Sequence, residues 1–116
     1  MGVRSVWQLK RVRKRMFKDL ERVIKARNLV LYDDVNEYTM VEVAKKIEEF
    51  AKYYAQAIGV MREQLQLAED NGYDIESSRF LYNYRALKDD TVEVVTVMFD
   101  MYTDVYNKIQ EVMCDE

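Results

Sequence analysis

The sequence predicts an all-α protein, a small helical bundle of three long helices plus one short helix. Apolar residues recur at alternating steps of three and four over three long stretches, which is the spacing of one face of an α-helix. The chain has no proline and only three glycines among its 116 residues, so few residues interrupt helices. This length suits one domain with its own core, and we assign residues 1–116 to a single helical domain.

The first predicted helix spans residues 5–28 and has one apolar arc and one basic face. The apolar arc holds Leu9, Val12, Met16, Phe17, Leu20, Val23 and Ile24. The opposite arc, which we call the basic face, holds Lys10, Arg11, Lys14, Arg15, Lys18, Arg22 and Lys25. Arg13 and Arg27 fall nearer the apolar side, where their stems can lie along it. Ten basic and two acidic residues up to Asn28 give a local charge of +8, so the remainder carries −11 to reach the total of −3.

Trp7 projects into the middle of the basic face at helical spacing. If the helix begins after it, the indole can fold back on the core. Otherwise it is an aromatic side chain set among cations, suited to stack on a base or to enter a partner protein.

The longest predicted helix spans residues 39–70 and follows an irregular connector at residues 29–38. Thr39 and Glu42 have the spacing of a capping box, which predicts the helix start. Asn71 and Gly72 predict its end, because glycine adopts the left-handed conformation that follows helices.

A second, thinner apolar stripe, Tyr53, Val60 and Leu67, recurs every seven residues on the side of this helix opposite its main apolar face. A seven-residue repeat stays nearly in line along a helix. Either another helix of the same chain covers this stripe, or a second copy or partner protein does.

The remaining chain predicts a short helix over residues 77–88 and a last helix over residues 91–114. Ser77 or Ser78 can cap the short helix. The polar segment from Lys88 to Thr91 predicts a turn or kink between the two helices. Helical spacing from Val92 onward outweighs the β-branched composition of the beginning of the last helix.

Nothing in the sequence points to catalysis, a metal or a cofactor. The chain has no histidine, which removes Ser-His and Cys-His catalysis and most zinc and haem ligation. The acidic pairs Asp100–Asp104 and Glu111–Asp115 fall on helix sides that should face water. No glycine-rich phosphate loop is present. We therefore expect no enzymatic activity.

The sequence also bears on compartment. No apolar run approaches the roughly 18 residues that a membrane span needs, and no secretory h-region is present. The one cysteine cannot form an internal disulfide, so we expect a reducing, cytoplasmic or intracellular location, or a virion.

The charge asymmetry supports two main hypotheses. In the first, the basic face binds the backbone of DNA or RNA and the acidic body forms a homo-oligomer, as in small helical viral proteins that coat or organise a genome. In the second, the chain is a protein-binding module, such as a small inhibitor or assembly factor, that docks a partner with its basic or acidic face. A helix lying on a membrane surface fits less well, because Trp7 sits with the cations. Alternatively, the basic face pairs with the protein's own acidic helices.

Overall fold

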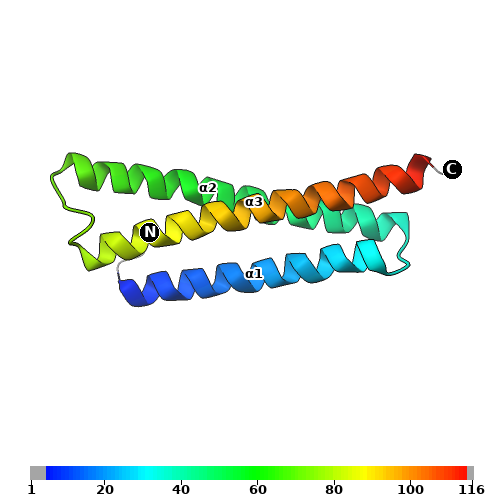
Figure 1. The fold of residues 1–116 in the computed structure, drawn as a ribbon, viewed down its shortest axis with the longest axis horizontal. Coiled ribbons are helices and arrows are strands. Elements are labelled where there is room, and N and C mark those ends of the chain that lie inside the picture. The colour runs from blue at the N-terminus through cyan, green and yellow to red at the C-terminus, as the bar shows by residue number, and fades with distance from the viewer. Residues whose placement is uncertain (1–4, 115–116) are drawn as a thin grey trace.

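The protein is a three-helix bundle, described over residues 5–114 by a computed structural model. The helices are α1 (Val6–Tyr32), α2 (Glu37–Asp70) and α3 (Arg79–Cys114). They run up, down and up, so α1 and α3 point in the same direction (Figure 1). The bundle is a rod that extends 61 × 23 × 22 Å. The all-α prediction is confirmed.

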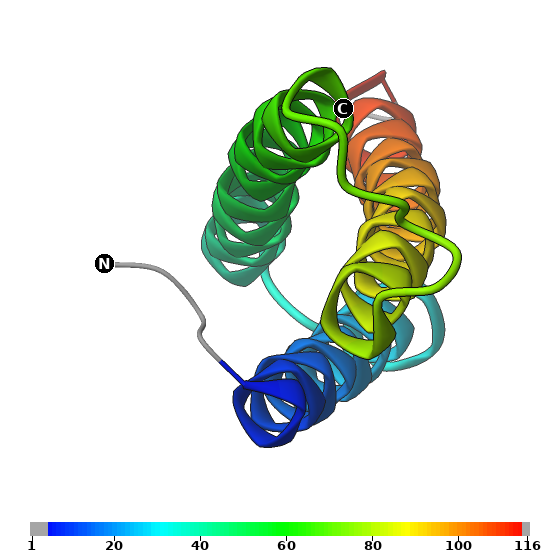
Figure 2. The same ribbon diagram turned by 90° about the vertical axis from the view of Figure 1, so that its left-hand side faces the viewer.

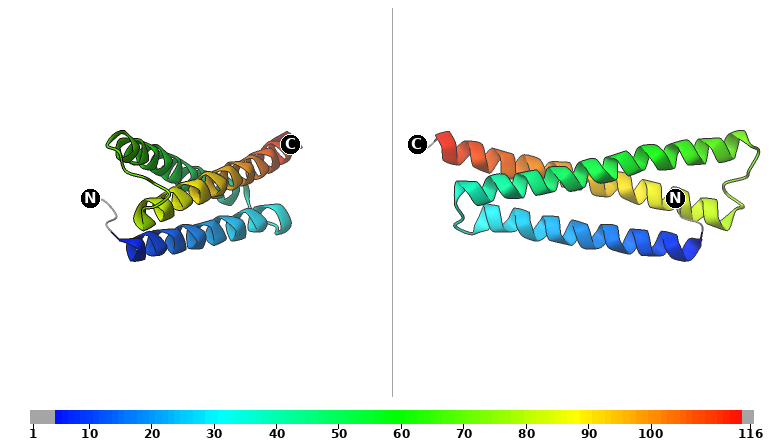
Figure 3. Two further views of the ribbon diagram at one scale, coloured as in Figure 1. Left: turned by 60° about the vertical axis from the view of Figure 1, so that its left-hand side comes forward. Right: turned by 180° about the vertical axis from the view of Figure 1, so that it is seen from behind.

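α3 is the helix that holds the bundle together. It packs against both of the others, most extensively against α2, whereas α1 and α2 touch each other least. Seen end-on, the three helices stand at the corners of a triangle (Figure 2). Side views show α2 and α3 crossing one another along the rod (Figure 3). One side of the α1–α2 seam therefore faces away from α3.

α1 is longer than predicted. Its N-cap is Ser5, whose hydroxyl accepts a hydrogen bond from the backbone N–H of Gln8 at 3.2 Å. The helix continues to Tyr32, so the prediction of an irregular connector from residue 29 was wrong. The physical reason is Val30, which lies seven residues after the buried Val23 and is itself fully buried.

α2 starts two residues before the predicted position. Asn36 is the N-cap, and its side-chain oxygen accepts from the backbone N–H of Thr39 at 2.8 Å. Thr39 therefore lies inside the first turn, and the predicted capping box was wrong. The predicted end is correct: Gly72 has φ +83°. The N–H groups of Gly72 and Tyr73 bond to the carbonyls of Glu69 and Ala68, which is a Schellman motif.

α3 is one continuous helix, so the predicted short helix and the turn at residues 88–91 were wrong. Its N-terminus is capped by Ser78, whose hydroxyl accepts from the N–H of Leu81 at 3.2 Å. Thr91 is buried, but its hydroxyl donates to the carbonyl of Leu87 at 2.7 Å and needs no break in the helix. Lys88 and Asp89 form an ion pair at 3.0 Å on the helix surface. The polar side chains of this segment thus find partners without a break in the helix.

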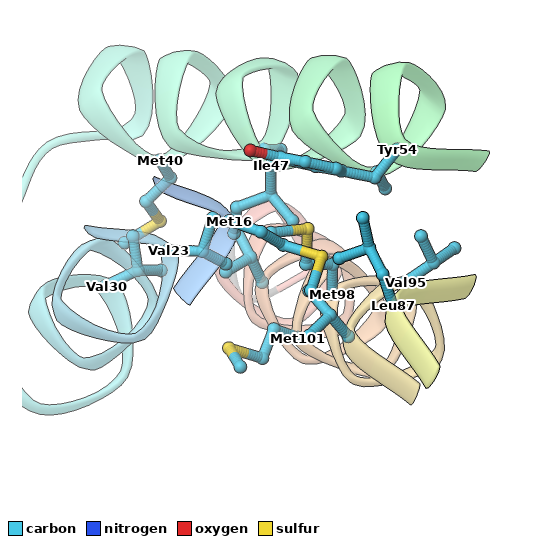
Figure 4. Close-up of a cluster of buried hydrophobic side chains, with 14 of the residues drawn as sticks. Met16, Val23, Val30, Met40, Ile47, Tyr54, Leu87, Val95, Met98 and Met101 are labelled. Carbon is cyan, nitrogen blue, oxygen red and sulfur yellow. The ribbon is translucent and has the colours of Figure 1, made fainter. Parts of the chain in front are cut away.

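The core is built from side chains that recur every seven residues on each helix. Figure 4 shows Met16, Ile47 and Met98 meeting at its centre. The repeating buried positions are Leu9, Met16, Val23 and Val30 on α1, Met40, Ile47, Tyr54 and Met61 on α2, and Leu87, Val94 and Met101 on α3. Such a repeat is typical of helices that pack at small crossing angles, as in coiled coils.

Candidate nucleic-acid interface

The seven residues of the basic face are all exposed along α1. Arg22 is 3.6 Å from Asp19 of the same helix. The other six form no ion pair with any residue between 5 and 114. The alternative, in which this face pairs with the protein's own acidic helices, was therefore wrong for the described residues.

Trp7 lies within the helix and on the basic face. Its side chain is 64% exposed, so the alternative of an indole folded back on the core was wrong. The guanidinium carbon of Arg11 lies 4.9 Å from the ring centroid. A cation at this distance is attracted to the face of the ring. The contact leaves the indole as an exposed aromatic surface among positive charges.

Arg13 and Arg27, predicted at the apolar boundary, join α1 to α3. Arg13 bonds to Asp90 at 2.6 Å, and Arg27 pairs with Asp104 at 3.4 Å. In each pair the two partners lie 77 residues apart in the sequence, because α1 and α3 run in the same direction and in a constant register. These two cations orient α1, so that the basic face points away from α3.

The acidic side chains of the body remain mostly in water. Glu93, Asp100 and Glu111 are exposed on α3 and form no ion pair with the described residues. The Asp100–Asp104 pair lies on that exposed surface, whereas Asp115 lies outside the described residues. Within residues 5–114 no group of three or more His, Cys, Asp or Glu side chains is arranged to hold a metal ion.

The stripe of Tyr53, Val60 and Leu67 is exposed on α2. The exposed fractions of the three residues are 63%, 56% and 53%. Neither α1 nor α3 covers them, so the alternative of an intrachain partner was wrong for the described chain. The stripe remains available to a second molecule.

A cleft of about 310 Å³ lies between α1 and α2. Arg15 and Asp19 line it from α1, and Lys46, Glu49, Phe50 and Tyr53 line it from α2. Arg15 of the basic face and Tyr53 of the exposed stripe therefore border the same depression. No pattern in the sequence connects these two surfaces.

Asp19, which lines the cleft, is hydrogen-bonded to the buried Tyr54, and sequence reasoning missed the role of both residues. Asp19 is only 8% exposed, and it accepts a hydrogen bond of 2.6 Å from the Tyr54 hydroxyl. Burial, followed by the bond to Asp19, raises the pKa of Tyr54 above its usual value. A signal was present: Asp19 lies three residues after Met16 and four before Val23, within the seven-residue core pattern of α1.

Tyr54 in turn supports the exposed ring of Tyr53. The two ring centroids are 5.0 Å apart and the ring planes are at 88°, an edge-to-face contact. Aromatic pairs favour this geometry. The buried hydrogen bond thus fixes one ring, and that ring restrains its exposed neighbour.

Comparisons with known proteins assign no relative: no family model, no curated protein and no solved structure matches the chain significantly. No helix within residues 5–114 is both long and apolar enough to cross a membrane.

Proposed function

We propose that this is a non-enzymatic protein that binds the phosphate backbone of DNA or RNA through the basic face of α1 and assembles through its acidic helical body. The observation that carries the proposal is the set of six exposed cations with no ion-pair partner among residues 5–114. Within the described chain these cations have no internal ion pair that must be broken before they meet a phosphate.

The spacing of the cations suits a polyanion. An α-helix rises about 1.5 Å per residue, so two turns hold several cations within about 11 Å. Duplex DNA carries one negative charge per roughly 1.7 Å of its axis. Binding releases counterions from the nucleic acid, and this release supplies affinity without base preference.

The negative net charge of −3 opposes binding, but the carboxylates that repel a phosphate act only over a short distance. The exposed carboxylates of α3 project from a different helix, and salt screens exposed charges that lie more than about 8–10 Å apart. Arg13 and Arg27 hold α1 against α3 with the basic face outward. A spatially separate basic surface therefore supports the proposal despite an acidic chain.

The test is a charge reversal measured by fluorescence anisotropy at low salt. Reversing Lys14→Glu and Lys18→Glu together should weaken binding to unrelated sequences by the same factor. A matched control, Arg62→Glu with Arg79→Glu, changes the net charge equally but lies on α2 and α3, and it should weaken binding much less. Equal effects of the two reversals, or no binding by the unmodified protein, would contradict the proposal.

A second candidate is a protein-binding module, which the exposed stripe of Tyr53, Val60 and Leu67 favours. Apolar side chains at seven-residue spacing can pack against a helix of another molecule. A small inhibitor or assembly factor would use this stripe together with the basic or the acidic face. Retention of a defined partner complex in salt that dissociates nucleic acid would favour this candidate.

A further inference from the structure

The cleft between α1 and α2 connects two surfaces that belong to different helices. Arg15 extends the basic face to the α1 side of the cleft, and Lys46 and Tyr53 lie on its α2 side. Both cations are exposed, and neither forms an ion pair with a residue between 5 and 114. A negatively charged strand lying along α1 would therefore meet one further cation, Lys46, and an aromatic ring on α2.

We propose that this cleft is a binding site for single-stranded nucleic acid, in which a base stacks on Tyr53 while the flanking phosphates contact Arg15 and Lys46. The proposal rests on the proposed function and specifies single strands as the ligand, since a paired base in a duplex cannot reach the ring. Exposed aromatic rings beside a basic groove are the usual means of holding unpaired bases.

The ring of Tyr53 is prepared for stacking by its surroundings. Most of its surface faces water, so a base can reach it without displacing another side chain. Its edge-to-face contact with Tyr54 restrains its orientation, and the bond between Tyr54 and Asp19 fixes Tyr54. A restrained ring loses little conformational freedom when a base stacks on it.

The two carboxylates that line the cleft favour an uncharged base over a phosphate beside them. Asp19 and Glu49 line the cleft together with Arg15 and Lys46, so its formal charges cancel. A phosphate is repelled by the carboxylates and attracted by Arg15 and Lys46. The uncharged base is compatible with the carboxylates, whose oxygens can accept from an N–H group of the base.

The face of α2 fits this occupant better than a second copy of the chain. The three stripe residues are separated by full heptads, and the intervening positions on the same side include Glu49, Gln56 and Glu63, which are exposed and polar. A coiled coil has apolar residues at both core positions of each heptad, so the stripe of one exposed apolar residue per heptad is a narrower contact surface. A single stacked base needs only one ring and its neighbouring cations.

The experiment compares binding of two labelled probes by fluorescence anisotropy. One probe is a single-stranded oligodeoxythymidine of about 16 nucleotides, and the other is a hairpin duplex of similar length. Tyr53→Ala should weaken single-strand binding roughly 5- to 150-fold and leave duplex binding unchanged. Tyr53→Phe keeps the ring and should bind both probes normally. Tyr82→Ala removes a tyrosine of similar exposure, 55% against 63%, from α3 and is the matched control.

Lys46→Ala provides a second, independent readout. Its loss should make the negative slope of log affinity against log salt less steep by about 0.7 for the single strand, the value for one phosphate. The slope for the duplex should stay the same. Because Lys46 and Tyr53 are exposed, circular dichroism should show unaltered folding in both variants.

The outcomes separate this inference from the proposed function. Tyr53→Ala that binds the single strand normally, while reversal of Lys14 and Lys18 abolishes binding, would overturn the cleft site alone. Absence of binding by the unmodified protein would overturn both proposals. Tyr53→Ala that dissociates an assembly in sedimentation and weakens both probes alike would instead assign Tyr53 to a contact between copies.

Discussion

The buried bond between Asp19 and Tyr54 gives a quantitative prediction for the stability of the bundle. Tyr54→Phe removes the hydroxyl that donates to Asp19 at 2.6 Å. The nearest remaining partner is Arg22 at 3.6 Å, which is too long for a good hydrogen bond. Hydrogen bonds to charged groups contribute about 1.5–3 kcal/mol. We therefore expect the free energy of unfolding to fall by about 2 kcal/mol.

The assay is urea unfolding followed by circular dichroism, arranged as a double-mutant cycle. A loss of about 2 kcal/mol corresponds to a midpoint lower by roughly 1 M urea. Asp19→Leu should also destabilise, because it leaves the Tyr54 hydroxyl buried without an acceptor. The double variant, Asp19→Leu with Tyr54→Phe, removes both polar groups and should recover most of the loss. Tyr53→Phe is the matched control and should leave the midpoint unchanged.

Additive effects of the two substitutions would refute this reasoning. Residues in one hydrogen bond should show a coupling energy of about 2 kcal/mol in the cycle, whereas independent residues show about 0.5 kcal/mol or less. A Tyr54→Phe variant as stable as the unmodified protein would likewise mean that the bond does not hold α1 against α2.

Three further predictions concern alkaline stability, Trp7 and the exposed stripe. The raised pKa of Tyr54 means that folding favours the neutral hydroxyl. Its contribution to the free energy of unfolding is therefore complete below the unfolded pKa near 10 and is lost as pH rises further. Tyr54→Phe should reduce this alkaline loss of stability, measured by urea unfolding. Trp7→Ala should weaken single-strand binding by about 1–3 kcal/mol and duplex binding less, as measured by anisotropy. Val60→Asp should shift sedimentation from a dimer or larger assembly toward the monomer at micromolar concentration; identical sedimentation of both proteins as strict monomers would exclude self-association through the stripe.

Helical periodicity was enough to predict which faces of the chain are buried. Most of the apolar arc of α1 and the main face of α2 pack inward because a 3.6-residue repeat leaves little choice once the chain is helical. Val12 and Phe17, also predicted on that arc, remain 40% and 38% exposed. Gly72 was equally predictable, since a positive φ at a helix end is a local requirement. The basic face followed from the same geometry.

Features that depend on a distant partner were not predictable from the sequence. The segment from Lys88 to Thr91 has the composition of a turn, but Asp90 meets Arg13 of α1 and the helix continues through it. The heptad position of Asp19 indicates burial, but the donor that Asp19 needs, the Tyr54 hydroxyl, comes from the facing helix. The cleft at Tyr53 arises only from the way α1 and α2 lie together, which no periodicity within one helix specifies.

The most direct test of the central proposal is the salt dependence of duplex binding. A labelled duplex is titrated with the unmodified protein at several salt concentrations, and the logarithm of the affinity is plotted against the logarithm of the salt concentration. If the basic face neutralises about five phosphates, the slope should be near −4.5. Affinity that does not change with salt, or no binding even at low salt, would contradict a backbone interface on α1.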